Sequence, residues 1–175
     1  VRTNNMTSCY IRPLVWRGAE QMGVAAQNTK INCAIAAWDW PRYFSAELHE
    51  KGISLATSPW RRPAPDTAPV HVKATGLYMI CTLSKHHAES IGFNDSLMLD
   101  YRGYVAEMTG ANLFFAKDGA LHTPAPDCFL DGITRRVVMG LARRNQIKVV
   151  ERPILPEELS RASEVMLVGT GAEVT

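Results

Sequence analysis

The sequence lacks the features that mark a membrane, secreted or nucleic-acid-binding protein. No apolar run approaches the roughly 20 residues of a membrane-spanning helix, and no signal peptide is visible. Lysine and arginine (19) nearly balance aspartate and glutamate (17), and no basic block stands out. We therefore expect a soluble, cytoplasmic protein with neither a membrane nor a nucleic acid as partner. Three arginine pairs are expected on solvated faces of the molecule: Arg61–Arg62, Arg135–Arg136 and Arg143–Arg144.

Cysteine is scarce and widely scattered. The four cysteines, Cys9, Cys33, Cys81 and Cys128, include no Cys-x-x-Cys pair. Zinc sites and redox dithiols need closer spacing, so we predict no metal site. The four thiols are expected to be buried, in a reducing compartment.

Local patterns predict a mixed α+β architecture with antiparallel hairpins. With 175 residues and 46% hydrophobic content, the chain can bury a substantial core. The four prolines of segment 58–69 predict an irregular loop, and Pro41 places a linker near residues 38–43. The apolar run 32–38 is too short to assign. Strands are expected at 9–16, 53–57, 147–151 and 165–168, hairpins at 96–107 and 112–122, and helices at 74–90, 133–145 and 156–161.

Four segments together supply what is needed to hold pyridoxal phosphate. Lys73 has small or apolar neighbours, which predicts a partly desolvated amine able to form a Schiff base. Glu107 ends a predicted strand, where its carboxylate can face a ring nitrogen. Gly132-Ile133-Thr134 opens a helix and Gly169-Thr170-Gly171 follows a strand, so both offer backbone N–H groups to a phosphate.

Each of these segments also fits an ordinary role when taken singly. Most lysines are surface charges, and a glutamate at a strand end is commonly solvated. Asp131-Gly132 is also common capping chemistry before a helix. Only the ordered set points to the cofactor.

The same segments resemble the class IV, fold type IV pyridoxal-phosphate aminotransferases, and within them the branched-chain amino acid aminotransferases. The resemblance implies the D-amino acid aminotransferase-like fold. Residues 1–42 would then be the remainder of a small N-terminal α/β domain with its linker, and residues 43–175 a larger pseudo-barrel domain that binds the cofactor. The motifs that carry the resemblance are Tyr10–Leu14, Ser58–Pro63, Lys73–Tyr78, Glu107–Phe114, Leu130–Thr134 and Gly169–Thr175.

The resemblance also implies roles for individual residues. Lys73 matches the catalytic lysine that holds the cofactor, Tyr78 the partner of the ring hydroxyl, and Glu107 the partner of the ring nitrogen. The remaining cofactor contacts would be Leu130 beside the ring and Gly132, Ile133, Thr134 and Thr170 at the phosphate. The substrate would be bound by Tyr10, Arg12, Gly171 and Ala172 at its carboxylates and by Val24, Trp40 and Tyr43 around its side chain. Trp40 and Tyr43 also fit a simple packing role beside Pro41.

The activity implied by the resemblance is reversible transamination of leucine, isoleucine and valine with 2-oxoglutarate, giving glutamate and branched 2-oxo acids, in a homodimer or higher homo-oligomer. A D-amino acid or (R)-amine aminotransferase, or aminodeoxychorismate lyase, is the alternative within the same fold.

A catalytically silent fragment is a further alternative. The chain begins at Val1 without methionine, and the family extends beyond both ends of this sequence, including an arginine that binds the phosphate. The chain also departs from the family pattern after Glu107, where Met108–Asn112 replaces the usual Gly-x-Gly-Glu-Asn.

Overall fold

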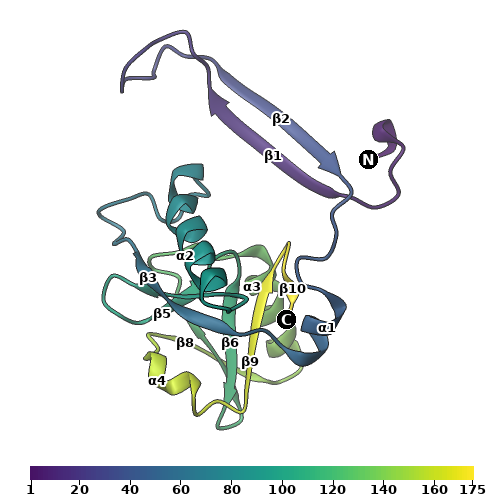
Figure 1. The fold of residues 1–175 in the computed structure, drawn as a ribbon, viewed down its shortest axis with the longest axis vertical. Coiled ribbons are helices and arrows are strands. Elements are labelled where there is room, and N and C mark those ends of the chain that lie inside the picture. Colours follow the sequence, from purple (N-terminus) through teal and green to yellow (C-terminus); the bar gives the residue numbers. More distant parts are fainter. The chain divides into compact units, whose positions relative to one another are not determined.

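A computed structural model describes residues 1–175, and the chain divides after Pro41 into two units, Val1–Pro41 and Arg42–Thr175. In the first unit, β1 (Tyr10–Arg17) pairs antiparallel with β2 (Ile31–Trp38), after the short 3₁₀ helix η1 (Arg2–Asn4) (Figure 1). The predicted first strand is confirmed, and the unassigned apolar run is its partner strand.

Strand pairing, and not a buried core, defines the first unit. Thr29 is its one buried residue, whereas Val15, Ile31 and Ile35 are each about two-thirds or more exposed. A two-stranded ribbon has two edges and no covered face, which also explains why Pro13 is tolerated in β1.

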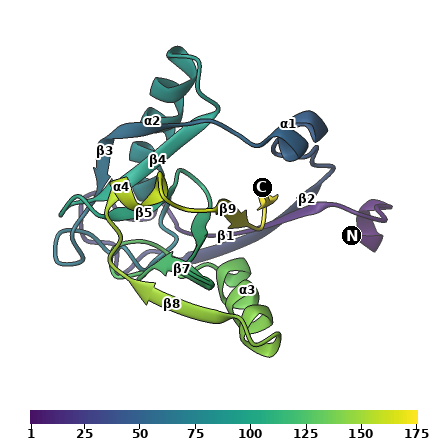
Figure 2. The same ribbon diagram turned by 90° about the horizontal axis from the view of Figure 1, so that it is seen from below.

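A three-stranded sheet begins the second unit. After α1 (Ala46–Lys51), β3 (Leu55–Arg62) pairs parallel with β4 (Asp95–Asp100), which pairs antiparallel with β5 (Val105–Met108). The parallel pair is connected through the 3₁₀ helix η2 (Thr75–Leu77) and α2 (Tyr78–Ser90), which packs on β3 and β4 (Figure 2). The predicted helix and the β4–β5 hairpin are confirmed.

A five-stranded sheet in the order β10-β9-β6-β7-β8 completes the second unit. The hairpin of β6 (Asn112–Lys117) and β7 (Ala120–Pro124) turns at Asp118 and Gly119, whose φ values are 50° and 71°. This left-handed pair is the turn that an Asp-Gly sequence favours. The remaining elements are α3 (Ile133–Arg144), β8 (Lys148–Arg152), α4 (Pro156–Leu159), β9 (Glu164–Gly169) and β10 (Glu173–Val174).

The core of the second unit lies on both faces of β6. Leu113 and Phe115 point into the main cluster with Met108, whereas Phe114 points the other way, toward Met139 of α3. All of these side chains are at most 5% exposed. A strand buried on both faces reads as a continuous apolar run, which is what residues 113–116 show.

Three sequence-based predictions are wrong. The segment from Ser58 to Arg62 continues β3 and is not part of a loop, because Pro59 falls where the register shifts and no ladder hydrogen bond is required of it. Arg62 and Arg135 are buried and not solvated, at 4% and 1% exposure, because distant carboxylates pair with them. Cys33 is exposed, since the ribbon has no covered face.

Two elements were not predicted, α1 and the two-residue strand β10. Both are shorter than the windows in which periodicity can be recognised. No helix in the structure combines the length and apolar character needed to cross a membrane.

Candidate functional site

Lys73 lies between the proline-rich segment and η2, where the chain leaves β3 and approaches α2. Its Nζ lies 5.6 Å from the centroid of the Tyr78 ring, at the first residue of α2. The side chain is exposed, so the predicted desolvation of the amine is wrong. Val70, which is 1% exposed, takes the apolar space instead and leaves the lysine accessible.

Glu107, on β5, is a buried carboxylate held from two sides. Its Oε1 lies 3.3 Å from Nε of Arg62, and its Oε2 accepts a hydrogen bond of 3.4 Å from Nδ2 of Asn112. Burial raises the pKa of Glu107 to about 7, against the opposing attraction of Arg62 and then Lys73. Glu107 and Lys73 are therefore within electrostatic reach of each other.

The N-terminus of α3 offers free backbone N–H groups. Gly132 is the N-cap residue, no side chain caps the helix, and its first turn contains no acidic residue. Asp131 does not cap it, because its carboxylate pairs with Arg135 at 2.8 Å and with Arg136 at 3.6 Å. With the helix dipole added, uncapped N–H groups form a binding place for an anion such as a phosphate.

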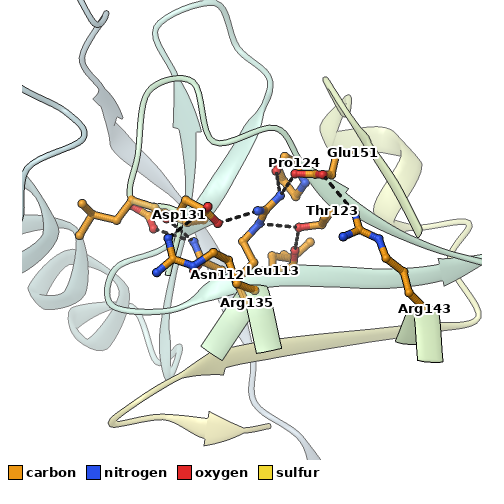
Figure 3. A network of polar contacts seen from close by, with 11 residues as sticks. Asn112, Leu113, Thr123, Pro124, Asp131, Arg135, Arg143 and Glu151 are labelled. Atoms are coloured by element: carbon orange, nitrogen blue, oxygen red, sulfur yellow. Dashed lines mark hydrogen bonds and ion pairs between the residues drawn. The ribbon is translucent and has the colours of Figure 1, made fainter. Parts of the chain in front are cut away.

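Arg135 fixes this helix end to the sheet (Figure 3). Its guanidinium donates to the Pro124 carbonyl at 3.0 Å, to Thr123 Oγ1 at 3.4 Å and to Glu151 Oε2 at 2.7 Å. Thr123 in turn donates to the carbonyl of Leu113 at 2.8 Å. The first turn of α3 is thus tied to β7 and β8 by side-chain contacts.

Asn112 connects the helix end to Glu107. Besides its contact with that carboxylate, Nδ2 donates to the Leu130 carbonyl at 3.0 Å, and a Cβ on Gly132 would collide with Oδ1. Asn112 also faces Val168 across the β6–β9 ladder, immediately before the second glycine turn. Glu107 and both glycine turns therefore gather at the beginning of β6.

The second turn follows β9 at close quarters. A Cβ on Gly169 would lie 3.3 Å from the Gly110 carbonyl oxygen and from the Ala111 side chain. Thr170 is exposed, whereas Ala172 is buried in the main core. The predicted contacts Leu130, Ile133 and Thr134 lie around the α3 end, where Ile133 is 70% exposed.

The predicted substrate residues are divided between the two units. In the first unit, Tyr10 packs on Trp40 with ring centroids 5.1 Å apart, and the Arg12 guanidinium lies 5.6 Å from the Tyr10 ring centroid. Val24, in the connection from β1 to β2, is fully exposed. In the second unit, Tyr43 packs edge-on against Phe44 at 4.9 Å. Their substrate roles, with those of Gly171 and Ala172, stay predictions.

Three residues at this site were missed as functional by the sequence reasoning: Arg62, Asn112 and Arg135. A signal was present for Asn112 and Arg62, which fall inside two of the motifs quoted above. For Arg135 no local signal separates a buried arginine from an exposed one.

An acidic cluster elsewhere has its charges already matched. Asp100, Asp127 and Cys128 place one ligand atom each within 4.8 Å of one another. Nη2 of Arg102 lies 2.6 Å from a carboxylate oxygen of each aspartate, and burial raises the pKa of the Cys128 thiol to about 12. This donor set does not suit a metal ion, which would need a thiolate and free carboxylates.

A hollow of about 470 Å³ lies away from this site, between α3 and the five-stranded sheet. Apolar side chains such as Leu121, Val138 and Met166 line it, and none of Lys73, Glu107 or Gly132 does. Size alone therefore does not identify the functional site, and the titratable groups identify it better.

Comparison with known proteins gives consistent relatives. Residues 1–175 match the family described as amino-transferase class IV. The branched-chain-amino-acid aminotransferase of Pseudomonas aeruginosa is 41% identical over 175 residues, which are 100% of this chain and 57% of that protein. That of Escherichia coli strain K12 is 42% identical over 179 residues, again 100% of this chain and 57% of that protein. The chain thus spans little more than half the length of the curated relatives it matches.

Solved structures give the same result. The Escherichia coli branched-chain amino acid aminotransferase superimposes with a TM-score of 0.95 at 41% identity, over 99% of this chain and 58% of that one. A thermophile's branched-chain amino acid aminotransferase (T.th.) with pyridoxamine 5'-phosphate has a TM-score of 0.93 at 39% identity, over 99% and 57%. An aminotransferase from Brucella abortus bound to the cofactor PLP has a TM-score of 0.80 at 31% identity, over 95% and 59%.

Proposed function

Because this chain belongs to the class IV aminotransferases, we propose that the protein carrying it transfers amino groups between branched-chain L-amino acids and 2-oxoglutarate, with pyridoxal phosphate as cofactor. Its relatives at about 40% identity bear the name branched-chain-amino-acid aminotransferase, and similar structures are described with pyridoxamine 5'-phosphate or PLP. We further propose a cytoplasmic homodimer or higher homo-oligomer.

The residues of the second unit fit the cofactor. The observation that carries the proposal is the buried Glu107 carboxylate lying in the field of an accessible Lys73 amine. Nearby, the uncapped first turn of α3 suits a doubly charged phosphate, and Gly132 keeps its Cβ position free beside Asn112. An amine, a buried carboxylate and an anion-binding helix end are the groups such a cofactor requires.

Each contact then has a distinct task. Bound pyridoxal phosphate supplies an aldehyde carbon and a ring that accepts electrons. Lys73 would hold it covalently, Glu107 would face the ring nitrogen, and Tyr78 would bond to the ring hydroxyl. The other cofactor contacts we propose are Leu130 at the ring, with the backbone of Gly132, Ile133 and Thr134 and the hydroxyls of Thr134 and Thr170 at the phosphate.

Lys73 is also the group that we propose moves the proton. Released as a free amine, its Nζ takes the proton from the α-carbon of the amino acid and later returns one. Its exposure leaves room for a substrate to approach, and the Tyr78 ring beneath Nζ restrains the side chain. Substrate carboxylates would be bound by Tyr10, Arg12, Gly171 and Ala172, and the branched side chain by Val24, Trp40 and Tyr43.

The visible absorption of the purified protein tests this function. We expect a yellow absorption band with pyridoxal phosphate that bleaches on addition of L-leucine and returns with 2-oxoglutarate. Lys73→Ala should lose the band's response and turnover, and a variant with normal rates would contradict the assignment. Bleaching by D-alanine or (R)-1-phenylethylamine in place of L-leucine would instead support the other aminotransferases of this fold, and no band at all would support a silent fragment.

A further inference from the structure

We propose that Arg62 is a positioning residue for this site, whose guanidinium orients the Glu107 carboxylate and keeps it charged toward the cofactor's ring nitrogen. This inference rests on the proposed function, because it assigns Arg62 a task for the group that Glu107 would face.

Arg62 and Glu107 meet in a dry place. Arg62 is the last residue of β3 and is 4% exposed, and Glu107 is 8% exposed. In the three-stranded sheet Arg62 stands opposite Asp100 and Glu107 opposite Met98, so the two side chains approach each other from the outer strands, with β4 between. An ion pair at 3.3 Å that is shielded from water is screened little, which makes its electrostatic effect large.

The contact is an electrostatic one more than a hydrogen bond. Nε of Arg62 has no hydrogen-bond partner, although it is the atom nearest Glu107. Its Nη1 instead donates to Sγ of Cys81 at 3.3 Å, which fixes the guanidinium against α2. Glu107 Oε2 is held by Asn112, so the carboxylate is oriented by one partner on each oxygen.

Arg62 is the cation that stays constant during the proposed reaction. The groups that act on Glu107 are Arg62 from β3, Lys73 from the segment before η2 and the Cys81 thiol from α2. Burial raises the pKa of Cys81 to about 11, so the thiol is neutral at pH 7. Lys73 must release and regain a proton in its proposed task, whereas a guanidinium remains protonated throughout.

The test compares Arg62→Gln and Arg62→Lys with Arg61→Gln, an exposed neighbour on the same strand. In the cofactor-free protein, the carbon-13 resonance of the Glu107 carboxyl is titrated with pH and assigned by its disappearance in Glu107→Gln. We expect Arg62→Gln to raise the midpoint of this titration by about one to three pH units. Arg62→Lys should raise it by less, and Arg61→Gln should leave it unchanged.

An unchanged midpoint in either folded Arg62 variant overturns the proposal. A structural role alone would lower the melting temperature of the Arg62 variants without moving the Glu107 titration. If Arg62→Gln does not fold, Arg62→Lys decides alone. Should the parent protein bind no pyridoxal phosphate, the proposed function fails, but this titration still decides the role of Arg62 toward Glu107.

A second measurement places the effect in the reaction. With pyridoxal phosphate bound, we expect Arg62→Gln to retain the covalent link to Lys73, seen as the absorption band, while kcat falls more than KM for L-leucine rises. Equal effects on kcat with Arg61→Gln would overturn the assignment of this loss to the Glu107 contact.

Discussion

At Glu107, burial and attraction oppose each other, and burial prevails. The carboxylate loses water on entering the core, which favours its protonated form, while Arg62 and Lys73 favour the charged form. The resulting pKa of about 7 makes this residue responsive to pH in the range where enzymes usually act.

The stability of the fold should therefore decrease as the pH rises toward neutrality. The folded state binds the Glu107 proton more tightly than the unfolded chain, because the folded pKa is about 7 and the ordinary value is 4.5. The free energy of unfolding then falls between about pH 4.5 and pH 7, by about 3 kcal/mol from this group. Urea unfolding of the parent and Glu107→Gln at several pH values measures it, and the variant should lack this decline.

Glu158 provides a control of opposite sign. Hydrogen bonds from Arg152 and from the Leu155 backbone lower its pKa to about 2. Its contribution to stability is present above the ordinary value of 4.5 and is lost as the pH falls toward 2. Glu158→Gln should alter only this acid limb, and identical neutral limbs in parent and Glu107→Gln would contradict the expectation for Glu107.

Among the elements, α3 depends on a single buried side chain for its attachment. Replacing Arg135 by Met removes the donors to Thr123, the Pro124 carbonyl and Glu151 at once. Because Asp131 and Glu151 are each 38% exposed and regain some water, we expect a loss of about 3 kcal/mol of unfolding free energy, the lower limit for breaking a buried pair. Thermal and urea unfolding measure this loss.

The neighbouring arginine is the matched control for this helix. Arg136 is 58% exposed and lies 3.6 Å from Asp131. Arg136→Met should therefore change stability by no more than about 0.5 kcal/mol. Equal losses in the two variants would show that Arg135 has no special part in attaching α3.

Glycine substitutions should have opposite signs in the β6–β7 turn and in α3. Gly119 has a φ of 71°, so an alanine there is strained and should cost about 1 kcal/mol. Gly140 lies inside α3 with only the tip of Arg144 near its Cβ position, so Gly140→Ala should add about 0.5–1 kcal/mol. Urea unfolding compares them, and a stabilised Gly119→Ala would disprove the turn geometry.

The elements that were predicted correctly carry their cause within a few residues. Asp118-Gly119 specifies its turn locally, and α2 and α3 show their period over three turns or more. Arg62 and Arg135 were misplaced because their partners, Glu107 and Glu151, come from distant strands. The exposure of Lys73 was missed for the same reason, since the apolar space beside it is filled by Val70.

At the scale of the whole molecule, the two units differ in what holds them together. Every buried apolar side chain belongs to Arg42–Thr175, whereas Val1–Pro41 contains only the β1–β2 ribbon. We expect residues 42–175, expressed alone, to unfold cooperatively, and a peptide of residues 1–41 to be mostly unfolded, because an isolated hairpin is marginal in water. Near-ultraviolet circular dichroism during urea unfolding measures both, and a non-cooperative 42–175 would contradict the expectation.

The shifted register of β3 has a consequence for changes in chain length. Between Thr57 and Arg61 the strand advances by four residues while β4 advances by two, and Pro59 and Trp60 are exposed there. Side chains alternate along a strand, so loss of both Pro59 and Trp60 would keep Ala56 and Arg62 on the same inner face. Loss of one alone would reverse that parity and turn Arg62 away from Glu107. Insertions and deletions in this stretch should thus be accepted in pairs.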